Sequence, residues 1–489
     1  MIKLNIRLLK LVSLCYLILP VFVFFLTWVK VWIGLPVVLL LFYVSFRYSQ
    51  SLTEEKAFEI NRFYFFGVLL LALLWLSYSG VGGFGIKIHD HYKIYCLAKD
   101  ISENAWPVSY QFEGKNYFLS SYLGYFISAP VLVGWISYKA IHIFLFLYGF
   151  LALIIGLLWL MVLTGVRAFW AVVIFIFVGG FDVAGYIFRN GLSFLEGMPQ
   201  FYWWNSLNSN DYLLYHGNSN LLFWAAPHAL PAWVASGVFF YDLLKKKEIS
   251  WSPVYLFPLV FWTPFILVGL LPFFALKAIM GNFRRLLKID NFLLLIPTFL
   301  LVWFVTSVGV AELDQGNIFR NVASKGQFLQ VVFNYSWFVL FEVLIWFVIV
   351  YLLLKNSMFL REHRIWFGLS LLVLMALPLY KLGKYNDWVQ RVSMPSLFLL
   401  WIWLIRGIKE SKSYLKYIAI LLIAVSSADS LTYWITGLKE SKGILGFNPL
   451  KIEEVKSMPQ AAKENDWPIE QYLAPADASF FKYVAKQSE

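Results

Sequence analysis

The chain has 489 residues, of which 60% are hydrophobic, 20% aromatic and only 14% charged. Soluble globular proteins carry about 25% charged residues, so this composition excludes a soluble enzyme and indicates an all-α, polytopic membrane protein. The net charge of +12 is spread over short segments between apolar blocks. That distribution favours a role in membrane topology and argues against nucleic acid as a partner.

Apolar blocks recur along the chain, and a bilayer crossing takes about 20 such residues. The blocks lie at 11–29, 31–46, 64–79, 118–137, 141–163, 169–187, 219–243, 252–264, 266–279, 291–308, 329–354, 365–381, 392–408 and 415–437. The serine-containing block 118–137 is expected to be interfacial or re-entrant. Counting it as a crossing would place the basic runs "KKK" and "NFRRLLK" outside. We therefore predict about 13 transmembrane helices and a cytoplasmic N-terminus.

This topology predicts one transmembrane domain, residues 1–437, and a polar tail, residues 438–489. The predicted outside loops are 80–117, 188–218, 309–328 and 382–391. The tail has too little apolar content for a core of its own, so we expect it to pack over these loops or to serve as a docking strap. The inside loops are short and contain no glycine-rich phosphate loop, which excludes a cytoplasmic nucleotide-sugar site.

The first outside loop, "GVGGFGIKIHDHYKIYC", contains the densest titratable cluster of the chain. Its glycines allow a sharp turn, and an amphipathic helix follows that ends at "WP", with Trp106 expected at the lipid headgroups. Asp90 is the candidate general base. His89 and His91 are candidates for tuning its pKa, for binding a phosphate when protonated or for joining it on a divalent metal such as Mg²⁺ or Mn²⁺. Lys93, on the same polar side, is a candidate substrate-binding residue. Solvated polar residues in an exposed loop are the alternative.

The second long outside loop is rich in Trp, Tyr and Asn and poor in charge. Aromatic faces beside amide groups suit a sugar, so Trp203, Trp204, His216 and Asn218 are candidate substrate-binding residues. An aromatic belt at the membrane surface explains the tryptophans equally well. His228 in "APHALP" lies near the start of a span, where a polar group is a functional candidate or a packed, hydrogen-bonded histidine.

Two later loops contain candidate contacts for a lipid phosphate. Arg320 and Lys325 lie in "ELDQGNIFRNVASKGQ". Asn386, Asp387 and Arg391 lie in "LGKYNDWVQRVSMPSLF". A guanidinium group at an outer helix end offers a bidentate fork to phosphate. A snorkelling arginine paired with the nearby Asp387 is the alternative.

Three acids, Asp182, Glu342 and Asp429, fall inside predicted spans. Ionisable groups at such positions are typical of ion pathways and support a transporter or flippase as an alternative function. They do not recur at matching positions of two halves, as an inverted repeat would require.

Together, the glycine turns after an early span, the acid in the first outside loop, the amphipathic helix ending in "WP" and the many spans resemble the GT-C class of membrane glycosyltransferases. More closely, "SNLLFWAAPHALPAW" and "GKYNDWVQRVSMPSLF" resemble segments of an uncharacterised bacterial branch of that class. The resemblance implies a GT-C-like fold, a polyprenyl-phosphate-linked sugar donor and inverting transfer to a glycan, lipid or protein acceptor. It implies a role for Asp90 as base or acceptor-positioning residue. Many members have two adjacent acids in this loop, whereas Asp90 has histidines on both sides.

The sequence therefore predicts a polyprenyl-phosphate-sugar-dependent glycosyltransferase of the bacterial cytoplasmic membrane, in contact with membrane lipids and active on the periplasmic or outer face. An O-antigen ligase or polymerase, which uses a lipid-diphosphate donor, is the enzyme alternative. Such proteins usually have one dominant outer loop between late spans, whereas here the early loop is the richest.

Overall fold

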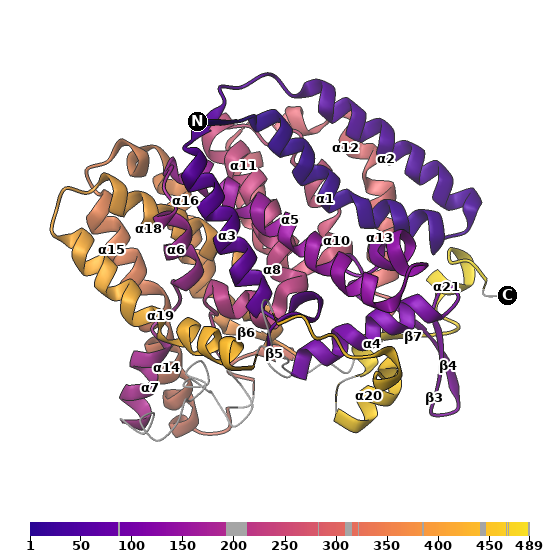
Figure 1. Ribbon diagram of the computed structural model, residues 1–489. Helices are drawn as coiled ribbons and strands as arrows, with labels where there is room; N and C mark the ends of the chain where they lie inside the picture. Colours follow the sequence, from indigo (N-terminus) through magenta and orange to yellow (C-terminus); the bar gives the residue numbers. More distant parts are fainter. Residues whose placement is uncertain are drawn as a thin grey trace.

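The protein is mostly helical (Figure 1), and the computed structural model describes residues 1–86, 89–191, 213–281, 283–308, 315–320, 322–383, 386–440, 446–465, 467 and 469–487. The helices are α1 (Ile6–Thr27), α2 (Val31–Ser51), α3 (Arg62–Tyr78), α4 (His89–Glu103), α5 (Tyr138–Thr164), α6 (Trp170–Phe177), α7 (Asp182–Asn190), α8 (Asn218–Tyr241), α9 (Ser252–Leu256), α10 (Leu259–Trp262), α11 (Pro264–Met280), α12 (Ile289–Leu293), α13 (Leu295–Val305), α14 (Lys325–Val339), α15 (Ile345–Leu354), α16 (Met358–Ala376), α17 (Asp387–Val392), α18 (Met394–Glu410), α19 (Leu415–Glu440), α20 (Met458–Asn465) and α21 (Ser479–Tyr483).

Seven short strands form three small antiparallel sheets among the described residues. The strands are β1 (Ile2–Leu4), β2 (Phe58–Ile60), β3 (Ser109–Phe112), β4 (Lys115–Leu119), β5 (Gln315–Asn317), β6 (Tyr380–Leu382) and β7 (Leu473–Pro475). They pair as β1–β2, β3–β4–β7 and β5–β6. The last two sheets lie at the end of the helix bundle where α4 and α20 also lie (Figure 1).

The expectation of a multi-pass, all-α membrane protein is confirmed. Within the described part of the chain, eight stretches are helical, long and apolar enough to cross a membrane: Ile6–Thr27, Val31–Ser51, Tyr138–Thr164, Trp170–Phe188, Asn218–Lys246, Lys325–Leu354, Met358–Leu379 and Leu415–Lys439. Shorter apolar helices span Arg62–Tyr78, Ser252–Trp262, Pro264–Met280 and Ile289–Val305. The total of 13 crossings stays a prediction.

The helices α5 and α8 form the centre of the bundle, where glycines of each helix face tryptophans of the other. Gly156 of α5 faces Trp233, and a Cβ atom there would lie 2.9 Å from the Trp233 Cβ. Gly237 of α8 faces Trp159 so closely that a Cβ atom would overlap the indole. Helices in membranes approach closely where small residues lie at the interface. These glycines therefore allow two fully buried indoles to pack between the helices.

The ambiguous block 118–137 contains no helix of crossing length. It leaves β4, passes through turns and ends in a π-helical turn at Pro130–Gly134. The Ser120 hydroxyl donates to the Phe304 carbonyl (2.7 Å) and the Tyr125 hydroxyl to the Leu145 carbonyl (2.8 Å). Side chains thus bind the backbone of α13 and α5, which holds this irregular segment in the protein.

Helix α4 is attached to the bundle through His91. One ring nitrogen, Nδ1, lies 3.0 Å from the Ile86 carbonyl oxygen, and Nε2 lies 2.8 Å from the Phe223 carbonyl oxygen. The imidazole packs against Gly80, which has a positive φ of 88° and no room for a Cβ atom. The turn after α3 therefore requires glycine both for its backbone conformation and for the space that His91 fills.

Trp106 differs from the expected headgroup anchor. Its indole N–H donates to the Ile101 carbonyl (2.7 Å), and its ring lies 5.5 Å from the Trp28 ring. The Trp106 side chain thus packs the C-terminal end of α4 against the end of α1, since the indole has both a hydrogen-bond acceptor and an apolar surface there.

The last part of the chain crosses this end of the molecule, and we call residues 446–487 the C-terminal strap. Its strand β7 adds to β4 as the third strand of a sheet. Near the end of the strap, the Lys486 amide donates to the Trp28 carbonyl (3.0 Å), and Phe480 packs against Phe304. The strap therefore connects α4, the β3–β4 hairpin and the end of α1.

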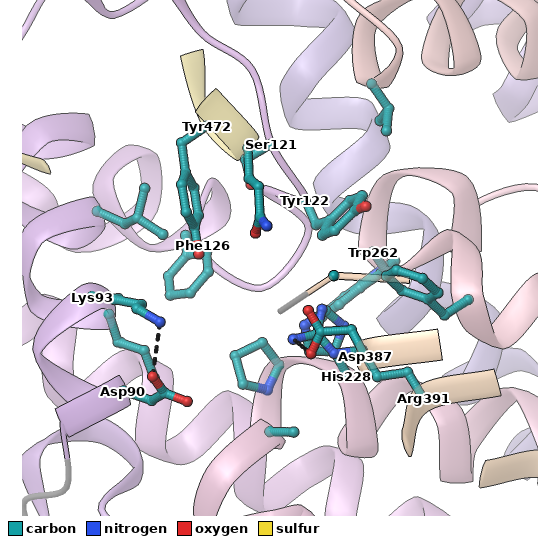
Figure 2. Close-up of a pocket in the computed structure, with 18 of the residues that line it drawn as sticks. Asp90, Lys93, Ser121, Tyr122, Phe126, His228, Trp262, Asp387, Arg391 and Tyr472 are labelled. Carbon is teal, nitrogen blue, oxygen red and sulfur yellow. Dashed lines mark hydrogen bonds and ion pairs between the residues drawn. The ribbon is translucent and has the colours of Figure 1, made fainter. Parts of the chain in front are cut away.

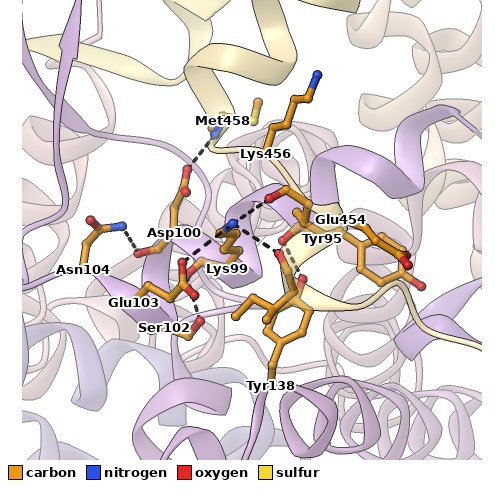
Figure 3. A network of polar contacts seen from close by, with 12 residues as sticks. Tyr95, Lys99, Asp100, Ser102, Glu103, Asn104, Tyr138, Glu454, Lys456 and Met458 are labelled. Atoms are coloured by element: carbon orange, nitrogen blue, oxygen red, sulfur yellow. Dashed lines mark hydrogen bonds and ion pairs between the residues drawn. The ribbon is translucent and has the colours of Figure 1, made fainter.

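Asp100 and Lys99 make polar contacts between α4 and the strap (Figure 3). Asp100 also contacts Tyr110 of β3. Its Oδ2 accepts the Met458 amide N–H and the Tyr110 hydroxyl, each at 2.7 Å. The Lys99 ammonium donates to the Val455 carbonyl at 2.6 Å. The strap buries Asp100, which is 2% exposed. That burial raises the pKa of Asp100 to about 6, although the Met458 and Tyr110 hydrogen bonds oppose the rise.

Substitution of Gly80 by alanine tests the packing of α4. We expect Gly80→Ala to lower stability by about 1–3 kcal/mol, because the methyl group meets the His91 ring and the positive φ disfavours it. Gly67→Ala, in α3 with open space around its Cα, is the matched control and should keep or slightly raise stability. Thermal unfolding in detergent measures both, and equal melting temperatures would contradict the assigned role of Gly80.

Docking of the strap should depend on pH through Asp100. Folding raises the pKa of this acid from 3.8 to about 6, so the folded protein holds a proton that the unfolded chain has released. Docking should weaken as the pH rises from about 4 to above 6, by at most about 3 kcal/mol for a shift of about two pKa units.

Amide hydrogen exchange in the strap, corrected for intrinsic rates, measures this effect. Asp100→Asn should abolish the pH dependence, while Glu103→Gln on the same helix should keep it. Retention of the full dependence in Asp100→Asn would assign it to another group.

Candidate active site

A cavity of about 310 Å³ lies beneath the strap, next to α4 (Figure 2). Its walls come from α4, the irregular segment after β4, α8, α10 and α11, α13, α17 and the strap. Among the residues that line it are Asp90, Lys93, Tyr122, Trp224, His228, Trp262, Phe265, Asp387, Arg391 and Tyr472. Five of these, Asp90, Lys93, His228, Asp387 and Arg391, are candidates from the sequence that the fold brings together.

One wall carries an ion pair at the start of α4. The Lys93 ammonium lies 2.8 Å from Asp90 Oδ1, and both side chains are partly exposed. Burial alone would lower the pKa of Lys93, but Tyr472 and Asp90 raise it above its ordinary value. The ammonium also lies over the Trp467 ring at 5.1 Å. Asp90 is thus held in the first turn of α4, where the helix dipole favours a carboxylate.

The facing wall carries a second ion pair (Figure 2). Arg391 Nη2 lies 2.9 Å from Asp387 Oδ1, one turn earlier on α17, and its guanidinium lies 5.4 Å from the centre of the Phe265 ring. Asn386 lies before this helix in the left-handed conformation (φ 57°), and its backbone N–H donates to the Gly383 carbonyl. Arg391 lines the cavity, whereas Asn386 is buried outside the lining.

His228 enters the cavity from α8, where the helix is kinked. The backbone is non-helical at Ala225 (φ −132°, ψ 34°), and Pro227 and Pro231 flank the histidine. The His228 Nδ1 lies 2.8 Å from the Thr263 hydroxyl oxygen. The prolines remove two backbone donors and bend α8, so the imidazole faces the cavity between the two ion pairs.

Tyrosines and tryptophans complete the lining, and the sequence did not single them out. Tyr122 comes from the segment after β4, Trp224 from α8, Trp262 from α10 and Tyr472 from the strap. Burial raises the pKa of Tyr122 to about 12 and also raises that of Tyr472, so both phenols stay neutral. A chain with 20% aromatic residues offers no local signal that distinguishes these four.

Other sequence candidates lie away from the cavity. His91 packs between the two carbonyls described above, and burial lowers its pKa. The neutral ring has one N–H, which it donates to one of these carbonyls. His216 is buried beside Gln390 of α17, and burial lowers its pKa to about 4. The Asn218 amide donates to the Phe175 carbonyl (2.8 Å). His91 thus contacts the α8 wall and His216 the α17 wall, each from outside the cavity lining.

The remaining candidates divide between described and undescribed positions. Arg320 lies against Gly316 beside β5, and Lys325 is exposed at the start of α14; neither lines the cavity. Trp203 and Trp204 lie outside the described residues, as does the side chain of His89.

The described residues do not fit the divalent metal considered for the first outside loop. Among them, no group of three or more His, Cys, Asp or Glu side chains is placed to hold one metal ion. Both His91 ring nitrogens face backbone carbonyls, and Asp90 and Asp387 are each paired with a cation on their own helix, Lys93 and Arg391. We therefore derive no reaction step through a metal.

The cavity combines three chemical features. Two cations can hold an anionic group, a carboxylate beside a lysine can accept a proton, and aromatic faces can pack on the apolar face of a sugar. The α11–α13 side adds an apolar wall of Phe265, Val305 and Val308. No family model, no curated protein and no solved structure matches this chain, so the geometry of the cavity alone carries the functional argument.

Proposed function

We propose that the cavity is the active site of an integral membrane glycosyltransferase that uses a polyprenyl-phosphate-linked sugar. The observation that carries this proposal is the placement of Asp90 and Arg391 on facing walls of one cavity, although they are far apart in the sequence. One supplies a base and the other a phosphate ligand, which are the two groups that transfer from a phosphate-linked sugar requires.

The walls suit a donor that is both anionic and lipid-linked. Arg391 offers the guanidinium fork and Lys93 a point charge, so the donor phosphate is expected between them. Phe265 and Val305 line the side toward α11 and α13, where Val302 is 43% exposed on the outer surface of α13. An apolar chain leaving the cavity on that side would stay in contact with apolar surface.

The reaction follows from these positions. Asp90 accepts the proton of an acceptor hydroxyl while the hydroxyl oxygen forms a bond to the anomeric carbon. The bond between that carbon and the phosphate oxygen breaks, and its electron pair stays on the phosphate, where Arg391 and Lys93 stabilise the charge. Attack opposite to the leaving phosphate inverts the anomeric centre.

The sugar itself is expected between the aromatic residues of the cavity. Tyr122 and Tyr472 offer neutral phenols as hydrogen-bond partners, and Trp224 and Trp262 offer apolar faces. The strap contributes Tyr472, so a docked strap is part of the proposed sugar site.

Replacement of Asp90 separates chemistry from binding. In nanodiscs with a panel of polyprenyl-phosphate sugars, Asp90→Asn should reduce donor turnover about 10²- to 10⁴-fold and keep donor affinity within a few-fold, because only the proton acceptor is lost. Glu103→Gln, an acid at the other end of α4, is the matched control and should keep turnover. Turnover unchanged in Asp90→Asn would reject Asp90 as the base. Binding of polyprenyl-diphosphate sugars alone would favour a ligase or polymerase.

Replacement of Arg391 tests the phosphate contact. Arg391→Gln should weaken donor binding about 10- to 100-fold, as expected for the loss of a charged hydrogen-bond donor. The variant leaves Asp387 unpaired, so the double variant Asp387→Asn/Arg391→Gln distinguishes lost binding from a destabilised turn. Arg320→Gln, which removes an arginine outside the cavity, should bind the donor normally. A larger loss in Arg320→Gln than in Arg391→Gln would place the phosphate elsewhere.

A further inference from the structure

A second polar site lies within the candidate membrane spans, where the span Trp170–Phe188 is interrupted. Helix α6 ends at Phe177 and α7 begins at Asp182, with a non-helical segment between them that contains Gly179 and Gly180. Breaks of this kind in a membrane are tolerated where other groups satisfy the freed backbone.

The start of α8 supplies those groups. The Asn218 amide donates to the Phe175 carbonyl (2.8 Å), and the Ser219 hydroxyl donates to the Ile176 carbonyl (2.7 Å). Gly179 lies directly against Gly217, because a Cβ atom on it would be 3.3 Å from the Gly217 Cα. The start of α8 therefore stabilises the interruption, because it hydrogen-bonds two carbonyl groups near the end of α6.

Glu342 faces this interruption from a neighbouring span. It lies in a π-helical turn, Leu340–Leu344, between α14 and α15, and a Cβ atom on Gly180 would overlap its Oε2. Such π-helical turns are frequent at functional sites. The absence of a side chain at Gly180 leaves the space that the Glu342 carboxyl group occupies.

Two further acids act on Glu342. They are Asp182 at the start of α7 and Asp429 in α19, and the Asn220 amide of α8 donates to Asp429 Oδ2. The exposed fractions of Glu342, Asp182 and Asp429 are 1%, 4% and 4%. Four candidate spans thus contribute to one buried cluster, which shares no residue with the cavity lining.

The hydrogen bonding of Glu342 leaves room for a ligand. Apart from an interaction with the Phe181 backbone, neither Glu342 oxygen has a hydrogen-bond partner, and the same holds for Asp429 Oδ1 and Asn220 Oδ1. Asp182 and Asp429, which act on Glu342, are both acidic, and Tyr215, ahead of α8, is a further titratable group near it. Unpaired acceptor oxygens at this depth carry a large desolvation cost unless a positive ligand is bound.

A proton fits these acceptors better than a metal ion. The described residues contain no group of three or more His, Cys, Asp or Glu side chains placed to hold a metal, whereas a proton needs one carboxyl oxygen and one acceptor nearby. Buried acids that act on one another in a low-dielectric medium cannot all be charged. We propose that Glu342, with Asp182 and Asp429, forms an intramembrane proton-binding site at the interrupted span, independent of glycosyl transfer in the cavity.

Infrared spectroscopy of the full chain in nanodiscs tests the proposal directly. The wild-type protein should show the C=O band of protonated carboxylic acid groups at neutral pH, with an isotope shift in D₂O. Glu342→Gln should lose a large part of that band. Asp290→Asn is the matched control, because Asp290 is also buried but faces Arg47 at 3.6 Å, and it should leave the band unchanged.

Three outcomes would overturn the proposal. An unchanged band in Glu342→Gln that folds with the wild-type melting temperature would show that Glu342 holds no proton. Loss of the wild-type band on adding NaCl at constant pH would assign the site to sodium. If Glu342→Gln does not fold, Asp429→Asn takes its place, and an unchanged band there would also reject a shared proton. This experiment does not measure glycosyl transfer. Its result therefore remains valid even if the function proposed for the cavity is rejected.

Discussion

The position of the candidate site depends on the buried imidazole of His91. Its two ring nitrogens lie within 3.0 Å of the carbonyl oxygens of Ile86 and Phe223, and the neutral ring donates its single N–H to one of them. The imidazole thus fixes the helix that presents Asp90. Because Phe223 lies just before the kink in α8, the same contact also relates Asp90 to His228. A buried imidazole packed between two backbone segments specifies one geometry, since a displacement would lose its hydrogen bond.

Around that fixed helix, electrostatics divide the molecule into two separate regions. In the cavity, each acid has a cation within 2.9 Å, so the charges of the two ion pairs are balanced. A polar ligand can then replace one partner of an ion pair. In the cluster around Glu342, Asp182 and Asp429 act on the Glu342 carboxyl group, and the Asn220 side-chain amide donates to Asp429. The first arrangement suits binding of a charged substrate, and the second suits a bound positive ligand. The chain therefore holds two separate polar regions with different charge balance.

Local patterns predicted much of the cavity and little of what surrounds it. The glycine turn and the helical periodicity placed Asp90 and Lys93 on one helix, and the end of a span placed Arg391 near the same membrane surface. His91 follows Asp90 in the sequence, but successive helical residues point about 100° apart, so it faces α8. The contribution of Tyr472 depends on pairing of β7 with β4, and a pairing between strands so distant in the chain leaves no periodic signal.

The strap also has a consequence for the order in which the protein matures. A chain is synthesised from its N-terminus, and the membrane helices up to α19 precede the strap in the sequence. The cavity consequently lacks the wall made by Tyr472 until the translated chain has passed that residue and β7 has paired with β4. A nascent chain that has formed all helices up to α19 would therefore still lack one wall of the cavity.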